Sequence, residues 1–188
     1  MLGKDAPALS VHGEPQLAQS IEKAAEATGL WAEATDEWGL DPGHWHPLSL
    51  LSPEGNLMVV PTSLSQMSPE AHRKWGVAVR RGTQKWPEPL ALVVTGSLSY
   101  RTDLNGHVDQ TLNVIRKFDD EIVRMLSGGT IGELDDMDKT LFKAAQPEGG
   151  WGSLYFLWGA LGENIPGSLH YYERPSPGVG SAAFLFNL

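Results

Sequence analysis

Two short, continuous apolar runs constrain most strongly what this chain can fold into. Leu57–Pro61 reads LMVVP and Leu90–Thr95 reads LALVVT, and each is bounded by Gly, Pro or Asn. Strands with one face in water alternate apolar and polar residues, whereas strands covered on both faces are apolar throughout. The two runs therefore predict a central sheet that is covered by helices on both sides.

Helical spacing of apolar residues predicts the elements that would cover this sheet. Ser68 is suited to cap a helix that begins at Pro69, and a Gly-Gly pair at 128–129 would stop another. Strands that alternate with helices follow α/β order. With 188 residues and no visible linker, we expect a single α/β domain over residues 1–188, with a mostly parallel, helix-covered sheet. The predicted helices cover residues 14–29, 68–82, about 108–126, 138–145 and 151–161, and a last strand covers 180–186.

The composition excludes several classes of partner and site. The chain has 23 acidic and 14 basic residues, a net charge of −9, which opposes binding to nucleic acid or to anionic lipid. It has no cysteine, so any metal would need His, Asp or Glu ligands. No apolar run reaches the roughly 20 residues that span a bilayer, and the first residues do not resemble a signal peptide. We expect a cytoplasmic protein that binds neither nucleic acid nor membrane.

The sequence DPGHWHP at residues 41–47 contains the sharpest candidate site. His44 and His46 are two residues apart, and in an extended loop both imidazoles could project to one side and bind a cation. Two histidines alone would leave such a site incomplete, so it needs a further ligand from elsewhere. The commoner outcome for such a pair is a loop that lines a pocket or an interface. Both interpretations stay open on this motif alone.

Seven segments follow one another in the order and at the spacing of a known family. The segment GLDPGHWHPL at 39–48 resembles a Gly-Leu-Asp-His-Gly-Thr-Trp-Val-Pro-Leu loop of that family. The segment LVVTGSLS at 92–99 resembles a strand that ends in Gly-x-Leu/Met-Ser-His. Together they resemble the class III extradiol ring-cleavage dioxygenases, the protocatechuate and DOPA type of non-haem iron enzyme. The segments are GEPQLA at 13–18, GLDPGHWHPL at 39–48, VVPTSL at 59–64, LVVTGSLS at 92–99, Phe118-Asp119, LWGAL at 157–161 and YERPSPGVGSAA at 172–183.

The resemblance implies a fold like the C-terminal portion of these enzymes, shortened at the N-terminus. It also implies an iron site of two histidines and one glutamate that binds a catecholic substrate and dioxygen. The two metal histidines have no counterpart in this chain. Pro42 and Tyr100 occupy the positions of two further functional histidines, and neither replaces an imidazole as a proton shuttle near neutral pH. Glu173 alone matches the family's glutamate ligand.

The leading hypothesis is a divergent, non-catalytic subunit of such a dioxygenase, without a cofactor. It would act as a structural or regulatory partner of a homologous catalytic subunit or of a second copy of itself. The segment with Pro42, His44, Trp45 and His46 would then be an altered substrate loop, open to a small aromatic ligand. If Glu173 is no longer a ligand, we expect it to pair with a neighbouring arginine, Arg174 or Arg101.

The alternative hypothesis is an active dioxygenase of aromatic compound catabolism. Fe(II) or another divalent metal would be held by His44, His46 and Glu173, with Tyr100 assisting at the position of the family's acid/base histidine. The substrate would be catechol-like or aminophenol-like. This hypothesis requires the three ligands to meet at roughly 2.0 to 2.2 Å from one ion. We expect His72 to be solvated on a helix surface, and no role for the isolated His107.

Overall fold

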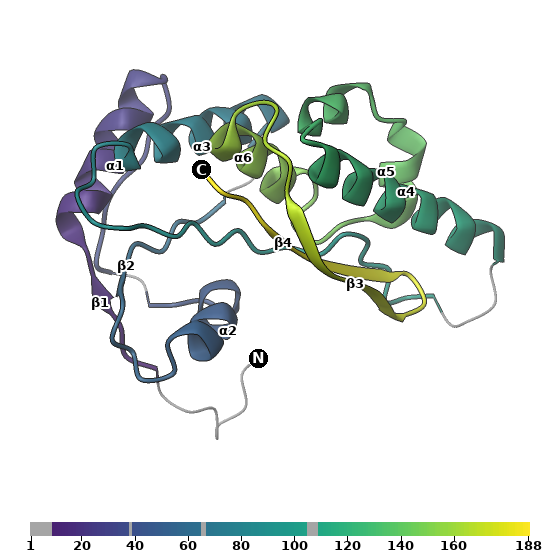
Figure 1. Ribbon diagram of the computed structural model, residues 1–188, viewed down its shortest axis with the longest axis horizontal. Coiled ribbons are helices and arrows are strands. Elements are labelled where there is room, and N and C mark those ends of the chain that lie inside the picture. Colours follow the sequence, from purple (N-terminus) through teal and green to yellow (C-terminus); the bar gives the residue numbers. More distant parts are fainter. Residues whose placement is uncertain (1–8, 38, 65–66, 105–108) are drawn as a thin grey trace.

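The computed structural model describes residues 9–37, 39–64, 67–104 and 109–188, with only the backbone of residue 109 (Figure 1). His107 and the first predicted residue of the third long helix lie outside these ranges. In Figure 1, α1 and α3 lie at one end, α4 and α5 at the other, and α6 between them. The elements are β1 (His12–Gly13), α1 (Pro15–Ala27), α2 (Pro42–Leu51), β2 (Met58–Val59), α3 (Pro69–Thr83), α4 (Asp109–Gly128), the 3-10 helix η1 (Ile131–Asp136), α5 (Lys139–Ala145), α6 (Gly152–Leu161), β3 (Ser168–Ser176) and β4 (Val179–Leu185).

The predicted helix boundaries are confirmed by their caps. Ser68 caps α3, because its hydroxyl oxygen accepts a hydrogen bond from the Ala71 backbone N–H at 3.2 Å. Pro69 is the first helical residue. Gly129, directly after α4, has a positive φ of 71°, a conformation that glycine adopts without a steric penalty. The short helix at 139–145 and the closing strand at 179–185 also lie where the sequence predicts them.

The apolar side chains form two clusters. The larger one joins α4, η1, α5 and α6. The smaller one joins α1, α3 and α6 and consists of Leu17, Ile21, Val79 and Phe156. The larger one consists of Leu98, Phe118, Ile122, Met125, Leu126, Ile131, Leu134, Met137, Leu141, Ala145, Tyr155 and Trp158. Helix α6 is apolar along most of its length and contributes to both clusters, so it is buried on several sides.

Glycines let α3 and α6 pack closely. A Cβ on Gly76 would lie 2.0 Å from the Phe156 carbonyl oxygen, and one on Gly159 would lie 1.9 Å from the Arg73 carbonyl oxygen. The same contact buries His72, which is only 6% exposed. The expectation of a solvated His72 is therefore wrong, because the face of α3 that carries it packs against the start of α6.

The predicted mostly parallel, helix-covered sheet is not confirmed. Strands β1 and β2 form a parallel pair of two residues each, and β3 and β4 form a separate antiparallel hairpin. The second apolar run, residues 90–95, is not a strand, since none of the described strands pairs with it. Leu90, Leu92 and Val93 are 47%, 44% and 51% exposed. The fold is mixed helix and strand, and the second apolar run is largely uncovered.

The predicted loop around DPGHWHP is instead the helix α2. Asp41 caps it, since its side-chain oxygen accepts from the His44 backbone N–H at 3.0 Å, and Pro42 takes the first helical position. Proline has no N–H to leave unpaired there, so Asp-Pro favours a helix start as readily as a turn. None of the residues of α2 is buried.

Candidate functional site

His44 has both ring nitrogens directed at oxygen atoms of the chain. Nε2 lies 3.2 Å from the Thr62 carbonyl oxygen, and Nδ1 lies 2.8 Å from Asp41 Oδ1. A carbonyl oxygen only accepts hydrogen bonds, so Nε2 carries a proton in this arrangement. A carboxylate oxygen faces the other nitrogen. In this conformation neither nitrogen presents a lone pair outward, as a metal ligand must.

His46 and Glu173 do not converge with His44. An α-helix has 3.6 residues per turn, so side chains two residues apart project from different faces of α2. The His46 ring is exposed and contacts the Trp45 ring edge to face, with centroids 5.2 Å apart. Glu173 is exposed on β3, where Oε2 accepts a hydrogen bond from the Tyr171 hydroxyl at 3.0 Å. That hydrogen bond raises the pKa of Tyr171.

The expected pairing of Glu173 with an arginine is wrong. Arg101 forms an ion pair with Asp103, with Nε and Oδ1 2.7 Å apart. Arg174, which follows Glu173 in β3, forms ion pairs with carboxylates of α4 instead. Successive side chains of a strand point to opposite faces, so the two neighbours cannot serve the same site.

The donor atoms do not fit the iron site that the resemblance implies. Within the described ranges, no three His, Asp or Glu side chains come together as a group that could hold a metal ion. The contacts of His44 give a local reason, because Nε2 is directed at the Thr62 carbonyl oxygen and Nδ1 lies beside the Asp41 carboxylate.

Tyr100 lies beside the hairpin. It forms an isolated antiparallel bridge with Val179, and its backbone N–H donates to the Ala145 carbonyl at 2.9 Å. Its side chain is 43% exposed. The preceding residue, Ser99, is fully buried. Its hydroxyl belongs to a polar network that the sequence does not identify as a site.

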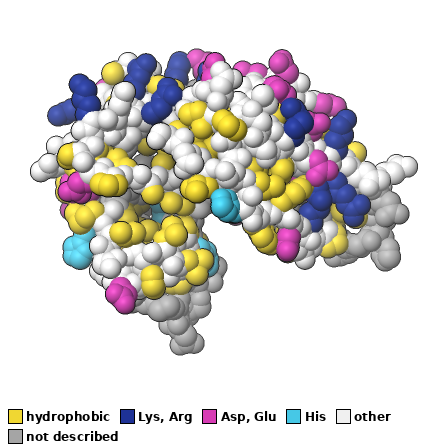
Figure 2. Space-filling view, in the orientation of Figure 1, with side chains coloured by type: hydrophobic (Ala, Val, Ile, Leu, Met, Phe, Trp, Pro, Cys, Tyr) yellow, Lys and Arg dark blue, Asp and Glu magenta, His cyan; other side chains and the backbone are white. Residues whose placement is uncertain are grey.

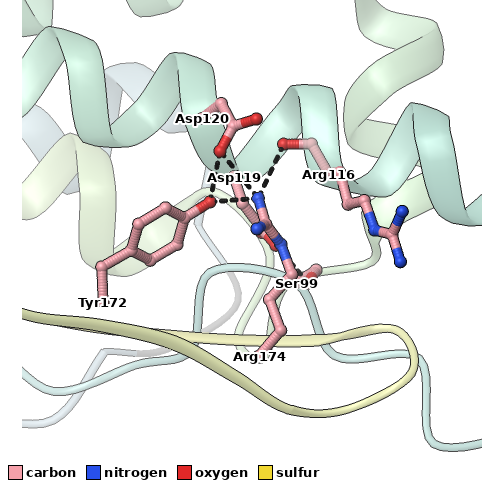
Figure 3. A network of polar contacts seen from close by, with 6 residues as sticks. All are labelled: Ser99, Arg116, Asp119, Asp120, Tyr172 and Arg174. Atoms are coloured by element: carbon pink, nitrogen blue, oxygen red, sulfur yellow. Dashed lines mark hydrogen bonds and ion pairs between the residues drawn. The ribbon is translucent and has the colours of Figure 1, made fainter.

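At the centre of this network is Asp119, a carboxylate with no exposed surface (Figure 3). Its Oδ2 accepts a hydrogen bond from Ser99 Oγ at 3.1 Å and lies 3.4 Å from Arg174 Nε. A Cβ on Gly180 would lie 2.4 Å from the same oxygen, so the carboxylate fills the space that a larger residue would need. Burial raises the pKa of Asp119, and the contacts with Ser99 and Arg174 oppose that shift.

Arg174 connects the hairpin to α4 through two contacts besides Asp119, and it also contacts Tyr172 of its own strand (Figure 3). Its Nη2 donates to Asp120 Oδ1 at 2.7 Å, to the Arg116 carbonyl at 3.3 Å, and to the Tyr172 hydroxyl. Tyr172 in turn donates to Asp120 Oδ1 at 2.6 Å. Burial alone would raise the pKa of Asp120, but the hydrogen bonds from Tyr172 and Arg174 outweigh it and lower that pKa.

The network borders a shallow cavity of about 270 Å³ between α4 and the hairpin turn. Leu112, Ile115 and Val179 supply its apolar wall. The sequence identifies Phe118-Asp119 only as one of the seven segments that resemble the family. The sequence signal for the rest of the network is Arg174, two residues after Tyr172, together with the acidic pair Asp119-Asp120. Nothing in the sequence shows that the strand with Arg174 faces α4.

The seven segments thus lie, in the order in which they resemble the extradiol dioxygenases, on a mixed helix-and-strand fold. The family model described as the catalytic LigB subunit of aromatic ring-opening dioxygenase matches residues 5–184, and the chain belongs to this family. No curated protein matches the chain. Over the described residues, none of the helices has the length and apolar character that crossing a membrane would require.

Proposed function

We propose that this chain is a divergent, non-catalytic subunit of an extradiol dioxygenase assembly. It has a structural or regulatory role beside a homologous catalytic chain or a second copy of itself. The observation that carries the proposal is the contact pair of His44, whose nitrogens face Thr62 and Asp41 instead of an open coordination position. Pro42 and Tyr100, at positions where the family has functional histidines, support the same conclusion.

The large surface of the chain supports a role in an assembly. Its solvent-accessible surface is 12087 Å² for a mass of 20.4 kDa. A compact monomer of that mass exposes about 8,800 Å² by the usual scaling of surface with size. The excess is larger than the roughly 800 Å² that each partner contributes to a standard protein interface. The exposed apolar residues Leu90, Leu92 and Val93 contribute to this excess.

The test of the non-catalytic role is a metal and turnover assay. The purified chain is incubated anaerobically with Fe(II), desalted, and analysed for bound iron, and then mixed with catechol or 2-aminophenol in air. We expect no stoichiometric iron, no substrate-dependent oxygen uptake and no coloured ring-opened product. A catalytic member of the family, treated in the same way, is the positive control.

The opposite result would support the rebuilt site. One equivalent of iron, together with ring cleavage that is lost in both His44→Ala and Glu173→Ala, would overturn the proposal in favour of an active enzyme. Gln84→Ala, an exposed substitution at the end of α3, is the matched control for a nonspecific effect of mutation.

A further inference from the structure

Residues 90–94, LALVV, form an uncovered segment with unpaired backbone, which we call the open segment. It crosses the middle of the molecule outside both sheets (Figure 1). Over the described residues, none of its backbone N–H or carbonyl groups pairs with another backbone group. Backbone pairing begins only at Leu98, whose N–H donates to the Gly180 carbonyl at 3.1 Å. Unpaired backbone of this kind is a template for another strand.

The side chains of the open segment are exposed on both sides. Leu92 and Val93 are adjacent in sequence and would point to opposite faces of a strand, yet both are about half exposed. Val94 packs against the same small cluster as Val60 of the other apolar run, so one end of the segment is anchored. Figure 2 shows hydrophobic side chains exposed over the central part of this face. Contiguous exposed apolar surface with open backbone marks an interaction site.

We propose that the open segment pairs with the same segment of a second copy, as antiparallel strands across a two-fold axis at Leu92. This inference rests on the proposed role as a subunit and names its partner. In this register Leu90 faces Val94, Ala91 faces Val93, and Leu92 faces its own copy. A two-fold axis makes the contact self-complementary and closes it at two chains.

The charge pattern favours self-pairing. The chain carries a net charge of −9, which repels a second copy in general, but residues 89–97 contain no charged side chain. Glu88, the nearest acidic residue, falls opposite Gly96 in the antiparallel register. Like charges therefore never face each other across the pair, a contact that would destabilise it. The uncharged stretch is also the stretch whose backbone is unpaired.

The size of the exposed surface also fits. The surface beyond that of a compact monomer, about 3,000 Å² per chain, exceeds what a stable dimer buries on each side. A two-stranded pairing alone is marginal in water, so the dimer also needs side-chain burial. The exposed residues Leu57 and Met58, in the run that Val60 anchors on the same small cluster, can supply it.

The first experiment uses charge exchange at the two-fold axis. We expect the unmodified chain to sediment as a dimer at micromolar concentration, and Leu92→Asp and Leu92→Lys each to sediment as monomers, because like charges then face each other. An equimolar mixture of the two variants should recover the dimer, because Asp then faces Lys. Leu50→Asp, at a residue that is 84% exposed on α2, should stay dimeric. Circular dichroism checks that each variant is folded.

The second experiment uses the absence of cysteine in the chain. In the proposed register the two copies of residue 92 have Cα atoms roughly 4.5 to 5.5 Å apart, within reach of a disulfide. Oxidised Leu92→Cys should therefore form a covalent dimer. Ala91→Cys, its matched control, faces residue 93 and lies too far from its own copy, so it should cross-link at least tenfold less.

The outcomes separate this inference from the proposed function. A chain that stays monomeric, or a mixture of charged variants that does not recover the dimer, overturns the self-pairing while the iron and turnover assay stands on its own. A dimer that binds iron and opens aromatic rings retains the pairing and overturns the non-catalytic role. Equal cross-linking at residues 91 and 92 overturns the register.

Discussion

The helical cluster around α4 and the open segment contain similar residues and differ in burial. Phe118 and Ile122 of α4 are buried, whereas Leu92 and Val93 of the open segment are about half exposed. A helix satisfies its backbone within itself, so it needs only one packing partner for its apolar face. A strand satisfies its backbone only through a neighbouring strand. Equal apolarity therefore buries a helix within this chain but leaves a strand segment dependent on another chain.

The largest expected effect of a single substitution is in the helical cluster. Phe118→Ala removes a ring with no exposed surface and should lower the free energy of unfolding by about 3 to 5 kcal/mol. Leu92→Ala, measured at a protein concentration at which the chain is monomeric, should change it by less than about 0.5 kcal/mol. Urea titrations followed by far-ultraviolet circular dichroism measure both. Similar losses at the two sites would contradict the contrast between the regions.

The contact between Gly180 and Asp119 should be the next most sensitive to substitution. Gly180→Ala would place a methyl group on the buried carboxylate and should cost about 1 to 3 kcal/mol of stability. Gly13→Ala, whose Cβ would meet no atom within 4 Å, is the matched control and should be close to neutral. In a double-mutant cycle with Asp119→Ala, the cost at Gly180 should shrink, because the clashing carboxylate is gone. Strict additivity would contradict this origin of the effect.

The same carboxylate should give the helical region a specific pH dependence. Burial raises the pKa of Asp119 in the folded chain above its ordinary value. Between those two values the folded state keeps a proton that the unfolded state has released, so stability falls as pH rises through that window. Asp119→Asn lacks this titration. The free energy of unfolding of the unmodified chain should therefore decline with rising pH relative to that variant, and a difference independent of pH would contradict the assignment.

The sequence predicts the helices well and the sheet poorly, for one physical reason. Caps such as Ser68 and stops such as Gly129 act within a few residues, so local sequence is enough to place α3 and the end of α4. The runs at 57–61 and 90–95 have the composition of buried strands, but strand formation depends on a neighbour that no local pattern shows.

The candidate site, too, could be predicted only where it depends on local sequence. The sequence identifies His44, His46 and Glu173 as possible ligands by residue type, but not that Asp41 would cap a helix there. Once the segment is helical, the two histidines project apart. The network around Asp119 depends on which face of β3 packs against α4, and that is a property of tertiary structure alone.

The smallest expected effects compare two helix caps. Ser68 caps α3, which buries part of its surface in the smaller cluster, whereas Asp41 caps α2, which buries none of its residues. Each cap accepts one backbone hydrogen bond, at 3.2 Å for Ser68 and 3.0 Å for Asp41. Replacement by alanine should cost each helix about 1 kcal/mol.

Ser68→Ala should lower the free energy of global unfolding by that amount, since α3 unfolds only with its cluster. Asp41→Ala should leave global unfolding unchanged and instead speed hydrogen exchange within α2, because an unburied helix opens by itself. Equal shifts in the global transition would show that α2 is held by the rest of the chain as firmly as α3, and would remove the distinction between the two regions.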